Sequence, residues 1–257
     1  MRIATWNVNG LRARLDFMKI WLQQRQPDVV GLQELKVTED EFPAEEFREL
    51  GYEVSIHSQK GWNGVGVLSK TPMETITCGL PGEEEMGARL ITVNVEGLSF
   101  TTVYVPNGKS LTHEDFPRKL AWLETLAAHW RNTTDINDQA VICGDFNVVP
   151  AAIDSWRGEK ADGGVFHTVE ERSRLAALTQ TGLFDIYREK YPDEQMFSWW
   201  DYRGGAFHRK MGLRIDFVYG TSAVLDRVSS VEIDREFRKK KDGLTASDHA
   251  PVIVDLA

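Results

Sequence analysis

The chain has 257 residues, of which 42% are hydrophobic and 27% charged, and its formal net charge at pH 7 is -9. A chain of this size buries a substantial core without disulfides or a structural metal, and no apolar run approaches the roughly 20 residues of a membrane helix, which excludes a helical membrane protein and predicts no membrane partner. Cys78 and Cys143 lack CxxC spacing and no signal-peptide pattern precedes the first apolar segment, so we expect reduced thiols and a cytoplasmic protein.

Short apolar segments alternate along the chain with longer segments of helical periodicity. Runs of four to eight apolar or alternating residues predict strands, and apolar positions repeated every three or four residues predict helices. In chain order, we expect a strand at 2–9, a helix at 15–24, a strand at 29–34, a helix at 39–50, strands at 53–58, 64–69, 90–95 and 98–105, a helix at 117–130, a strand at 139–147, a helix at 170–180, and strands at 213–220 and 250–257.

This order of elements is typical of a mixed α/β protein. Two sheets packed face to face with helices outside would bury both the strands that are connected by hairpins and the strands that are connected through helices. The sequence contains no linker, no low-complexity segment and no fixed-period repeat, so we expect one domain over residues 1–257. The pattern does not fix the order of the strands.

Acidic, amide and imidazole side chains stand at or just beyond several of these apolar segments. A carboxylate next to a strand core is costly unless it is paired, hydrogen-bonded or bound to a cation. Strand ends at one edge of a sheet converge, and oxygen ligands without cysteine suit Mg²⁺ or Mn²⁺ better than zinc. The residues concerned are Asn7, Glu34, Asp145, Asn147, Asp216, Asp248 and His249.

His249 differs from the other histidines in its surroundings. Asp248 precedes it directly, and Asp216 comes from a separate predicted strand. A carboxylate bonded to one imidazole nitrogen fixes the tautomer and leaves the other nitrogen free to act, although a structural histidine is the alternative. A hard cation, a carboxylate base and a supported histidine together indicate hydrolysis of a phosphate ester.

The acidic net charge argues at first against a nucleic-acid partner. Basic residues nevertheless cluster locally, at Arg12 and Arg14, at Arg118 and Lys119, at Arg203 with Arg209 and Lys210, and in the segment DREFRKKKDG at 234–243. Net charge therefore does not decide the partner.

Eight segments carry a family resemblance. They are TWNVNGLRAR, PDVVGLQELK, GWNGVGVLSK, YVPNG, GDFNVVP, FSWWDYR, GLRIDFVY and SDHAPVIVD. They occur in the order found in exonuclease III-type AP endonucleases of the endonuclease/exonuclease/phosphatase superfamily, and the resemblance extends over nearly the whole chain. It implies a four-layer α/β sandwich, in which two packed mixed sheets are flanked by helices and the active site lies at one edge.

The resemblance also implies residue roles. Glu34 is similar to the principal metal ligand, Asp145 to the residue that activates water, and Tyr104 to a tyrosine that contacts the scissile phosphate. The implied catalytic residues are Tyr104, Asp145, Asn147, Asp216 and His249. The implied metal-site residues are Asn7, Glu34, Asp145, Asn147, Asp248 and His249, with Mg²⁺ as cofactor and Mn²⁺ as the alternative.

The implied substrate is double-stranded DNA with abasic sites or blocked 3′ ends. Asn107 is similar to an amide near the attacking water, and Trp199, Leu213 and Ile215 resemble the apolar walls of a pocket for an extruded baseless sugar, although ordinary core is the other interpretation. An abasic nucleotide is easily extruded because no base pair is lost. The expected activities are cleavage 5′ to abasic sites and 3′-end processing, as 3′–5′ exonuclease, 3′-phosphodiesterase or 3′-phosphatase, by a monomer.

Two other functions are compatible with this catalytic core. Some proteins with this fold have lost the catalytic carboxylates and act as nucleic-acid-binding regulators. Others hydrolyse small phosphorylated ligands or lipids, so the core alone implies only phosphoester hydrolysis. The carboxylates are all present here, and a nicking assay on abasic duplex DNA, beside an inositol phosphate substrate, separates the three functions.

Overall fold

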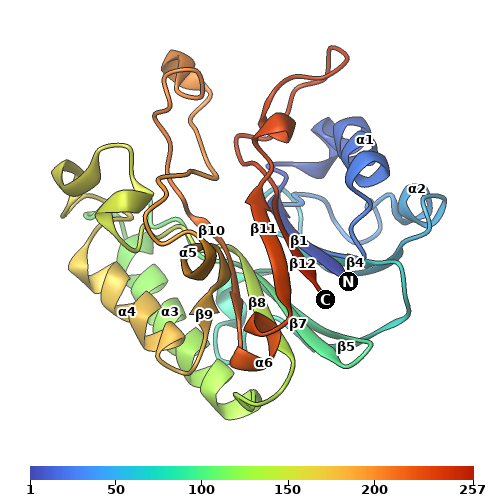
Figure 1. Ribbon diagram of the computed structural model, residues 1–257, viewed down its shortest axis with the longest axis horizontal. Coiled ribbons are helices and arrows are strands. Elements are labelled where there is room, and N and C mark those ends of the chain that lie inside the picture. The colour runs from blue at the N-terminus through green and yellow to red at the C-terminus, as the bar shows by residue number, and fades with distance from the viewer.

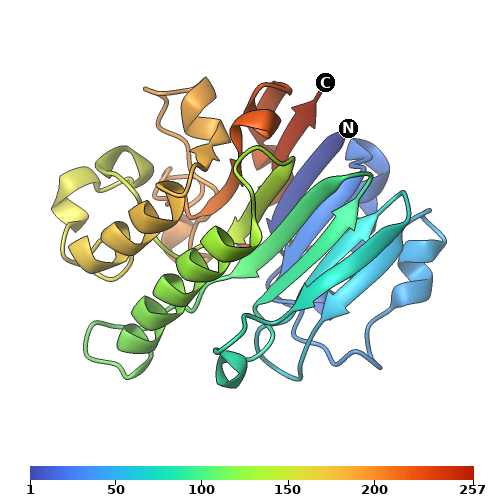
Figure 2. The same ribbon diagram turned by 90° about the horizontal axis from the view of Figure 1, so that it is seen from below.

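Two mixed six-stranded sheets pack face to face, and helices cover their outer faces (Figures 1 and 2). The structure, a computed structural model, describes residues 1–257. The first sheet has the order β11 (Val228–Ile233), β12 (Val252–Leu256), β1 (Arg2–Asn7), β2 (Val29–Gln33), β4 (Val65–Ser69) and β3 (Glu53–His57). The second has the order β5 (Met73–Cys78), β6 (Leu90–Val95), β7 (Leu98–Tyr104), β8 (Ala140–Asp145), β10 (Asp216–Gly220) and β9 (Phe184–Asp185).

The helices form the two outer layers, so that the molecule has four. The first sheet is covered by α1 (Leu15–Arg25) and α2 (Ala44–Arg48), and the second by α3 (Asp115–Thr133) and α4 (Val169–Thr179) (Figure 1). Two short helices, α5 (Ile186–Lys190) and α6 (Ser222–Leu225), flank β10 in the sequence. None of the helices is both long and apolar enough to cross a lipid bilayer.

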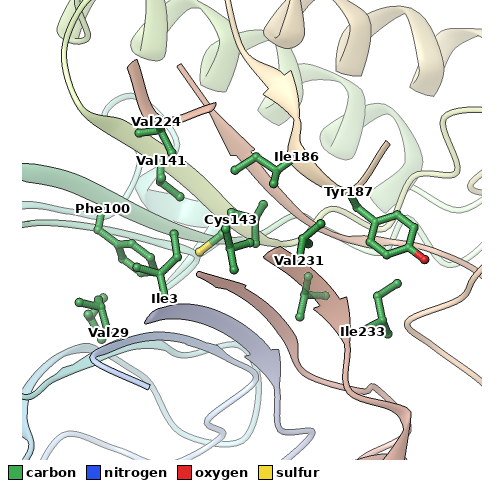
Figure 3. Packing of buried hydrophobic residues seen from close by; sticks show 14 of the residues in the cluster. Ile3, Val29, Phe100, Val141, Cys143, Ile186, Tyr187, Val224, Val231 and Ile233 are labelled. Carbon is green, nitrogen blue, oxygen red and sulfur yellow. The ribbon is translucent and has the colours of Figure 1, made fainter. Parts of the chain in front are cut away.

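Three apolar clusters hold these layers together. The largest lies between the sheets, where Ile3 and Val29 of one sheet face Phe100 and Val141 of the other (Figure 3). The second fills the space under α1 and α2, and the third fills the space under α3 and α4. Strands that are covered on both faces read as continuous apolar runs, which is why the sequence indicated β1, β2 and β8 directly.

The topology gathers several strand ends at one edge. Two parallel pairs, β1 with β2 and β7 with β8, end together, because Asn7 is opposite Gln33 and Tyr104 is opposite Asp145. The antiparallel neighbours begin where these strands end, so Asp216 at the start of β10 is opposite Asp145. Polar residues at these positions therefore converge although they lie far apart in the sequence.

The expected four-layer α/β sandwich is confirmed, with corrections to individual elements. The helix expected at 39–50 is reduced to α2, and the strand expected at 213–220 begins at Asp216, since Leu213 pairs with Trp199 in an isolated bridge. Strands β5, β9 and β11 were not predicted. All three lie at sheet edges; β9 has only two residues, and half or more of the residues of β5 and β11 are exposed, so these strands carry little apolar signal.

Gly144 lies at a close approach of two strands. Its φ is +139°, and a Cβ added there would lie 2.0 Å from the carbonyl oxygen of Val103. We expect Gly144→Ala to lower the free energy of unfolding by at least about 3 kcal/mol, because backbone strain and overpacking act together.

Gly97→Ala is the matched control for this prediction. Gly97 also has positive φ, +83°, but nothing lies within 4 Å of the added Cβ. Its expected loss is only the left-handed strain of about 1–2 kcal/mol. Urea denaturation of both variants measures the difference, and equal losses would show that the Val103 approach is not a constraint.

Candidate active site

Two carboxylates face each other at the gathered strand ends. Glu34 follows β2 and Asp145 ends β8, and ligand atoms of both lie within 4.8 Å of each other and of an imidazole nitrogen of His249. Asp145 is 1% exposed, whereas the side chain of Glu34 keeps 15% of its surface exposed. Positive φ at Glu34, +54°, turns the chain out of the strand and aims its carboxylate at the group.

Asn7 holds the two carboxylates in place. Its Nδ2 donates to Oε1 of Glu34 at 2.7 Å and to Oδ2 of Asp145 at 2.9 Å. Its Oδ1 accepts from the backbone N–H of Asn9 at 2.9 Å, which fixes the orientation of the amide. Lys36 also contacts Glu34, with its Nζ 2.7 Å from Oε2. One amide therefore bridges carboxylates from both sheets.

His249 is held by a carboxylate on its far side. Its Nδ1 lies 2.9 Å from Oδ2 of Asp216, and Ser198 donates its hydroxyl to the same oxygen at 2.6 Å. The other nitrogen, Nε2, lies 3.8 Å from Oδ2 of Asp145. The two nitrogens thus have separate partners, so His249 is oriented toward the carboxylate group by Asp216.

Burial and charge shift the proton equilibria of this group in opposite directions. Burial raises the pKa of Asp145, which His249 opposes and the carboxylates of Asp216 and Glu34 reinforce. Burial alone would lower the pKa of His249, but the carboxylates of Asp216 and Asp145 outweigh it and raise that pKa well above its ordinary value. His249 is accordingly an imidazolium at neutral pH, a hydrogen-bond donor on both nitrogens.

Asn147 and Asn107 lie beside the carboxylates. The Nδ2 of Asn107 donates to Oδ1 of Asn147 at 3.2 Å, and the Nδ2 of Asn147 donates to the carbonyl of Val105 at 3.0 Å. The backbone N–H of Asn147 donates to Oδ1 of Asp145 at 2.9 Å. Asn147 has a positive φ of +50°, a conformation that asparagine tolerates better than most residues.

Lys119, expected from the sequence to form a basic cluster with Arg118, is instead 0% exposed and supports this loop from inside the protein. Its Nζ donates to the carbonyl of Asn147 at 2.6 Å and pairs with the carboxylate of Glu171, which is equally buried. Glu171 in turn accepts from the backbone N–H of Phe166 at 3.1 Å. A single buried ion pair therefore ties α3 and α4 to the loop that carries Asn147.

Tyr104 ends β7 at the same edge. The guanidinium of Arg89 lies 5.0 Å from the centre of its ring, and Arg89 also donates to the Tyr104 carbonyl at 3.1 Å. Burial raises the pKa of Tyr104, and the carboxylates of Glu34 and Asp145 raise it further. The phenol is therefore protonated at neutral pH and is a donor next to the acidic group.

Asp248 lies outside the group formed by Glu34, Asp145 and His249. Its Oδ1 accepts from Nδ2 of Asn9 at 2.8 Å and its Oδ2 from Nε1 of Trp199 at 3.0 Å. These bonds link the loop before His249 to Trp199. A metal-ligand role for Asp248 stays a prediction.

An apolar cluster adjoins the polar group. The structure brings Trp199, Leu213 and Ile215 together, and Val149 and Phe166 complete the cluster. Trp199 also forms isolated bridges with Leu213 and His249, so its backbone joins the apolar cluster to the polar group. The predicted pocket residues are thus neighbours of the predicted catalytic ones.

Several residues of this site were not predicted from the sequence. The residue types alone did not indicate a place in the site, because a lysine in a predicted helix or a serine among aromatic residues does not normally belong to an active site. Ser198 lies in the segment FSWWDYR and Val149 in GDFNVVP, so those motifs marked the right neighbourhood. The residues concerned are Asn9, Lys36, Arg89, Lys119, Val149, Phe166 and Ser198.

The donor set of the group fits a hard divalent cation. The carboxylate oxygens of Glu34 and Asp145 are hard ligands and no thiolate is present, which favours Mg²⁺ or Mn²⁺ over zinc, whereas His249 as an imidazolium has no lone pair to offer a metal. Burial raises the pKa of Asp145, and repulsion from the like charges of Asp216 and Glu34 raises it further. A cation held by Glu34 and Asp145 would offset that repulsion.

Comparisons with known proteins agree with this geometry. The sequence profile of the endonuclease/exonuclease/phosphatase family matches residues 4–249. Exodeoxyribonuclease III of Haemophilus influenzae is 34% identical over 98% of both chains, and the DNA repair nuclease APEX1 of Danio rerio is 31% identical over all of this chain and 82% of its own.

Solved structures show the same fold over the full length. A Neisseria 3′ phosphatase, NExo, bound to a product DNA hairpin is 34% identical and superimposes with a TM-score of 0.95 over 100% of this chain and 99% of its own. An AP endonuclease from Archaeoglobus fulgidus is 33% identical, with the same TM-score and the same coverage.

Replacement of the buried lysine tests its support of the site. Lys119→Met keeps the length of the side chain but leaves Glu171 without its partner and the Asn147 carbonyl without its donor. We expect a loss of about 3–5 kcal/mol in the free energy of unfolding, as is typical when one partner of a buried ion pair is removed.

Arg174→Met is the control for Lys119→Met. Arg174 pairs with Glu124, whose side chain is 59% exposed, so the expected loss is about 0–1 kcal/mol. Chemical denaturation reports both values. Similar small losses for the two variants would mean that Lys119 does not hold the loop.

Proposed function

The chain belongs to the endonuclease/exonuclease/phosphatase family, and on that premise we propose that it is a DNA repair phosphodiesterase of the exonuclease III type. It is a hydrolytic nuclease, and its relatives of similar length are exodeoxyribonucleases, a 3′ phosphatase and an AP endonuclease. One observation carries the proposal: Glu34, Asp145 and His249 meet within 4.8 Å at one sheet edge.

Residues on both sheets are assigned to a metal site. Glu34 and Asp145 would hold a divalent cation, and Asn7 bridges the two carboxylates and orients them. A bound Mg²⁺ or Mn²⁺ supplies charge neutralisation for phosphate oxygens. Proteins of this family are metal-dependent, and Mg²⁺ is our proposal for the ion.

Asp145 is the proposed base. It is buried, its pKa is raised, and Oδ1 is fixed by the Asn147 N–H at 2.9 Å. A carboxylate with a raised pKa is better matched to taking a proton from water at neutral pH than an ordinary one. Asn107, whose amide reaches Asn147, would lie next to the attacking water.

Three donors are assigned to the phosphate oxygens. His249, held as an imidazolium by Asp216, offers Nε2, and Asn147 and Tyr104 offer an amide and a phenol from neighbouring strand ends. Donors that are fixed before the substrate binds stabilise the negative charge that develops during displacement at phosphorus. Asp216 acts through His249 and does not itself touch the substrate.

The apolar cluster is the proposed pocket for a baseless sugar. Trp199, Leu213 and Ile215 are contiguous and adjoin His249. An abasic nucleotide leaves the duplex at little cost, and an apolar wall suits a deoxyribose without its base. We propose that the substrate is duplex DNA with abasic sites or blocked 3′ ends, bound by a monomeric single-domain enzyme in the cytoplasm.

Asp145→Asn tests the base. We expect the turnover number on abasic duplex DNA to fall by roughly 10² to 10⁴-fold, as is usual when a general base is lost. DNA affinity, measured by fluorescence anisotropy, stays within the range of the parent. A turnover number close to that of the parent would remove Asp145 from the mechanism.

A substrate panel tests the function and its metal dependence together. Abasic, 3′-phosphate and blunt-ended duplexes are incubated with Mg²⁺, with Mn²⁺ and with excess chelator. We expect cleavage of abasic and 3′-blocked duplexes with Mg²⁺, none with chelator, and recovery when Mg²⁺ is restored, because the carboxylate group needs a cation.

The same panel decides between the proposal and its alternatives. DNA binding without any cleavage would favour a nucleic-acid-binding regulator. Faster turnover of an inositol phosphate than of any DNA would favour a phosphatase of small ligands. Activity that persists in excess chelator would contradict the metal-dependent mechanism.

A further inference from the structure

A basic hollow lies beside the active site and is not used by the proposed chemistry. Two loops rise from the same edge as the site, the segment 201–208 and the segment 238–240, orange and red at the top of Figure 1. Strand β1 runs toward them and ends at Asn7. The hollow between them has a volume of about 370 Å³.

The chemistry of the lining is that of an anion site. Its charged residues are Arg238, Lys239, Lys240 and a single acid, Asp201. Asp201 is already paired with Arg203, with 2.7 Å between its Oδ2 and Nη2. The chain as a whole carries a net charge of -9, so this concentration of cations is a local feature of the hollow.

Arg238 fixes the floor of the hollow to the active site. Its Nε donates to the carbonyl of Asp248 and its Nη2 to the carbonyl of Trp200, both at 3.1 Å. Its guanidinium lies 5.1 Å from the ring centre of Tyr202 and 5.3 Å from that of Phe207. Arg238, which lines the hollow, is therefore hydrogen-bonded to the residue that directly precedes His249.

Tyr202 joins the hollow to a third loop. Its hydroxyl donates to the carbonyl of Ala246 at 2.9 Å and accepts from Nη2 of Arg14 at 3.0 Å. These bonds fix the position of Tyr202 in the wall of the hollow. Lys240 has no hydrogen-bond or ion-pair partner, and Lys239 pairs only with the exposed Glu236, an interaction that an incoming anion can replace.

We propose that this hollow binds a phosphate of the DNA backbone outside the catalytic group, with Lys239 and Lys240 as its contacts. Its place on the site edge means that a strand held at His249 continues across it, and lysines on a preformed rim neutralise phosphates without reading sequence. The inference rests on the proposed function and adds a second anchoring point for the same strand. It also explains how an acidic protein binds an acidic polymer.

The double variant Lys239→Ser/Lys240→Ser tests the site on the full-length protein. Binding to a short duplex with a stable abasic analogue is measured by anisotropy in excess chelator, so that no turnover occurs. We expect affinity at low salt to fall roughly tenfold and the slope of log affinity against log salt to decrease in magnitude by about 1, since one phosphate contact contributes about 0.9.

A neutral-phosphate scan locates the contact. Single methylphosphonate linkages are placed one at a time along the duplex, and each removes one backbone charge. With the parent protein, several positions weaken binding. With the double variant we expect the penalty to vanish at one or two adjacent positions and to persist at those that meet His249 and Tyr104.

Lys70→Ser/Arg131→Ser is the matched control. Lys70 follows the end of β4 that pairs with the start of β2, and Arg131 lies in the last turn of α3, just before β8 begins. Both therefore lie at the edge opposite the site. We expect this variant to keep the affinity, the salt slope and every methylphosphonate penalty of the parent, and thermal unfolding checks that both variants are folded.

Three outcomes would overturn the proposal. In the first, every methylphosphonate position weakens binding of the double variant as much as it weakens binding of the parent. In the second, the affinity and salt slope of the double variant change no more than those of the control. In the third, the loss of affinity becomes smaller at all methylphosphonate positions together. A parent protein that binds the duplex but cuts no DNA would instead contradict the proposed function, while the scan would still report on the hollow.

Discussion

Asp145, Asp216 and His249 are only 1%, 2% and 4% exposed, at an edge where two sheets meet. Charged groups removed from water to this extent are stable only when each has a partner of opposite charge or a donor, and here each has one. Asp216 holds His249, His249 faces Asp145, and Asn7 bridges Asp145 to Glu34. The rest of the architecture keeps these side chains at the distances that their hydrogen bonds and ion pairs require.

The packing of the two sheets sets these distances. Glu34 and Asn7 come from one sheet and Asp145 and Asp216 from the other, so the apolar cluster between the sheets sets the spacing across the site. A mutation in that cluster would change the separation of the carboxylates. Packed interiors transmit such changes because they compress little.

Support for the site extends well beyond the reacting groups. Lys119 reaches from α3 to the Asn147 carbonyl. Arg238, at the start of the segment 238–240, donates to the carbonyls of Asp248 and Trp200. Lys119 thus fixes the backbone at Asn147, and Arg238 fixes the backbone directly before His249. Fixed backbone of this kind preorganises donors, which is how most of the electrostatic stabilisation in enzymes arises.

The sequence by itself determined the element types where strands are buried on both faces, and it determined the chemistry, because carboxylates and a histidine next to strand cores require a partner. It did not indicate the edge strands β5 and β11, whose exposed faces lack an apolar pattern. Only the tertiary structure decided that Trp199 and Leu213 pack with Phe166 outside the regular strands, that Lys119 is a buried support, and that Lys240 lines the same hollow as Arg238. These facts depend on contacts between residues far apart in the chain, and no local pattern encodes such distances.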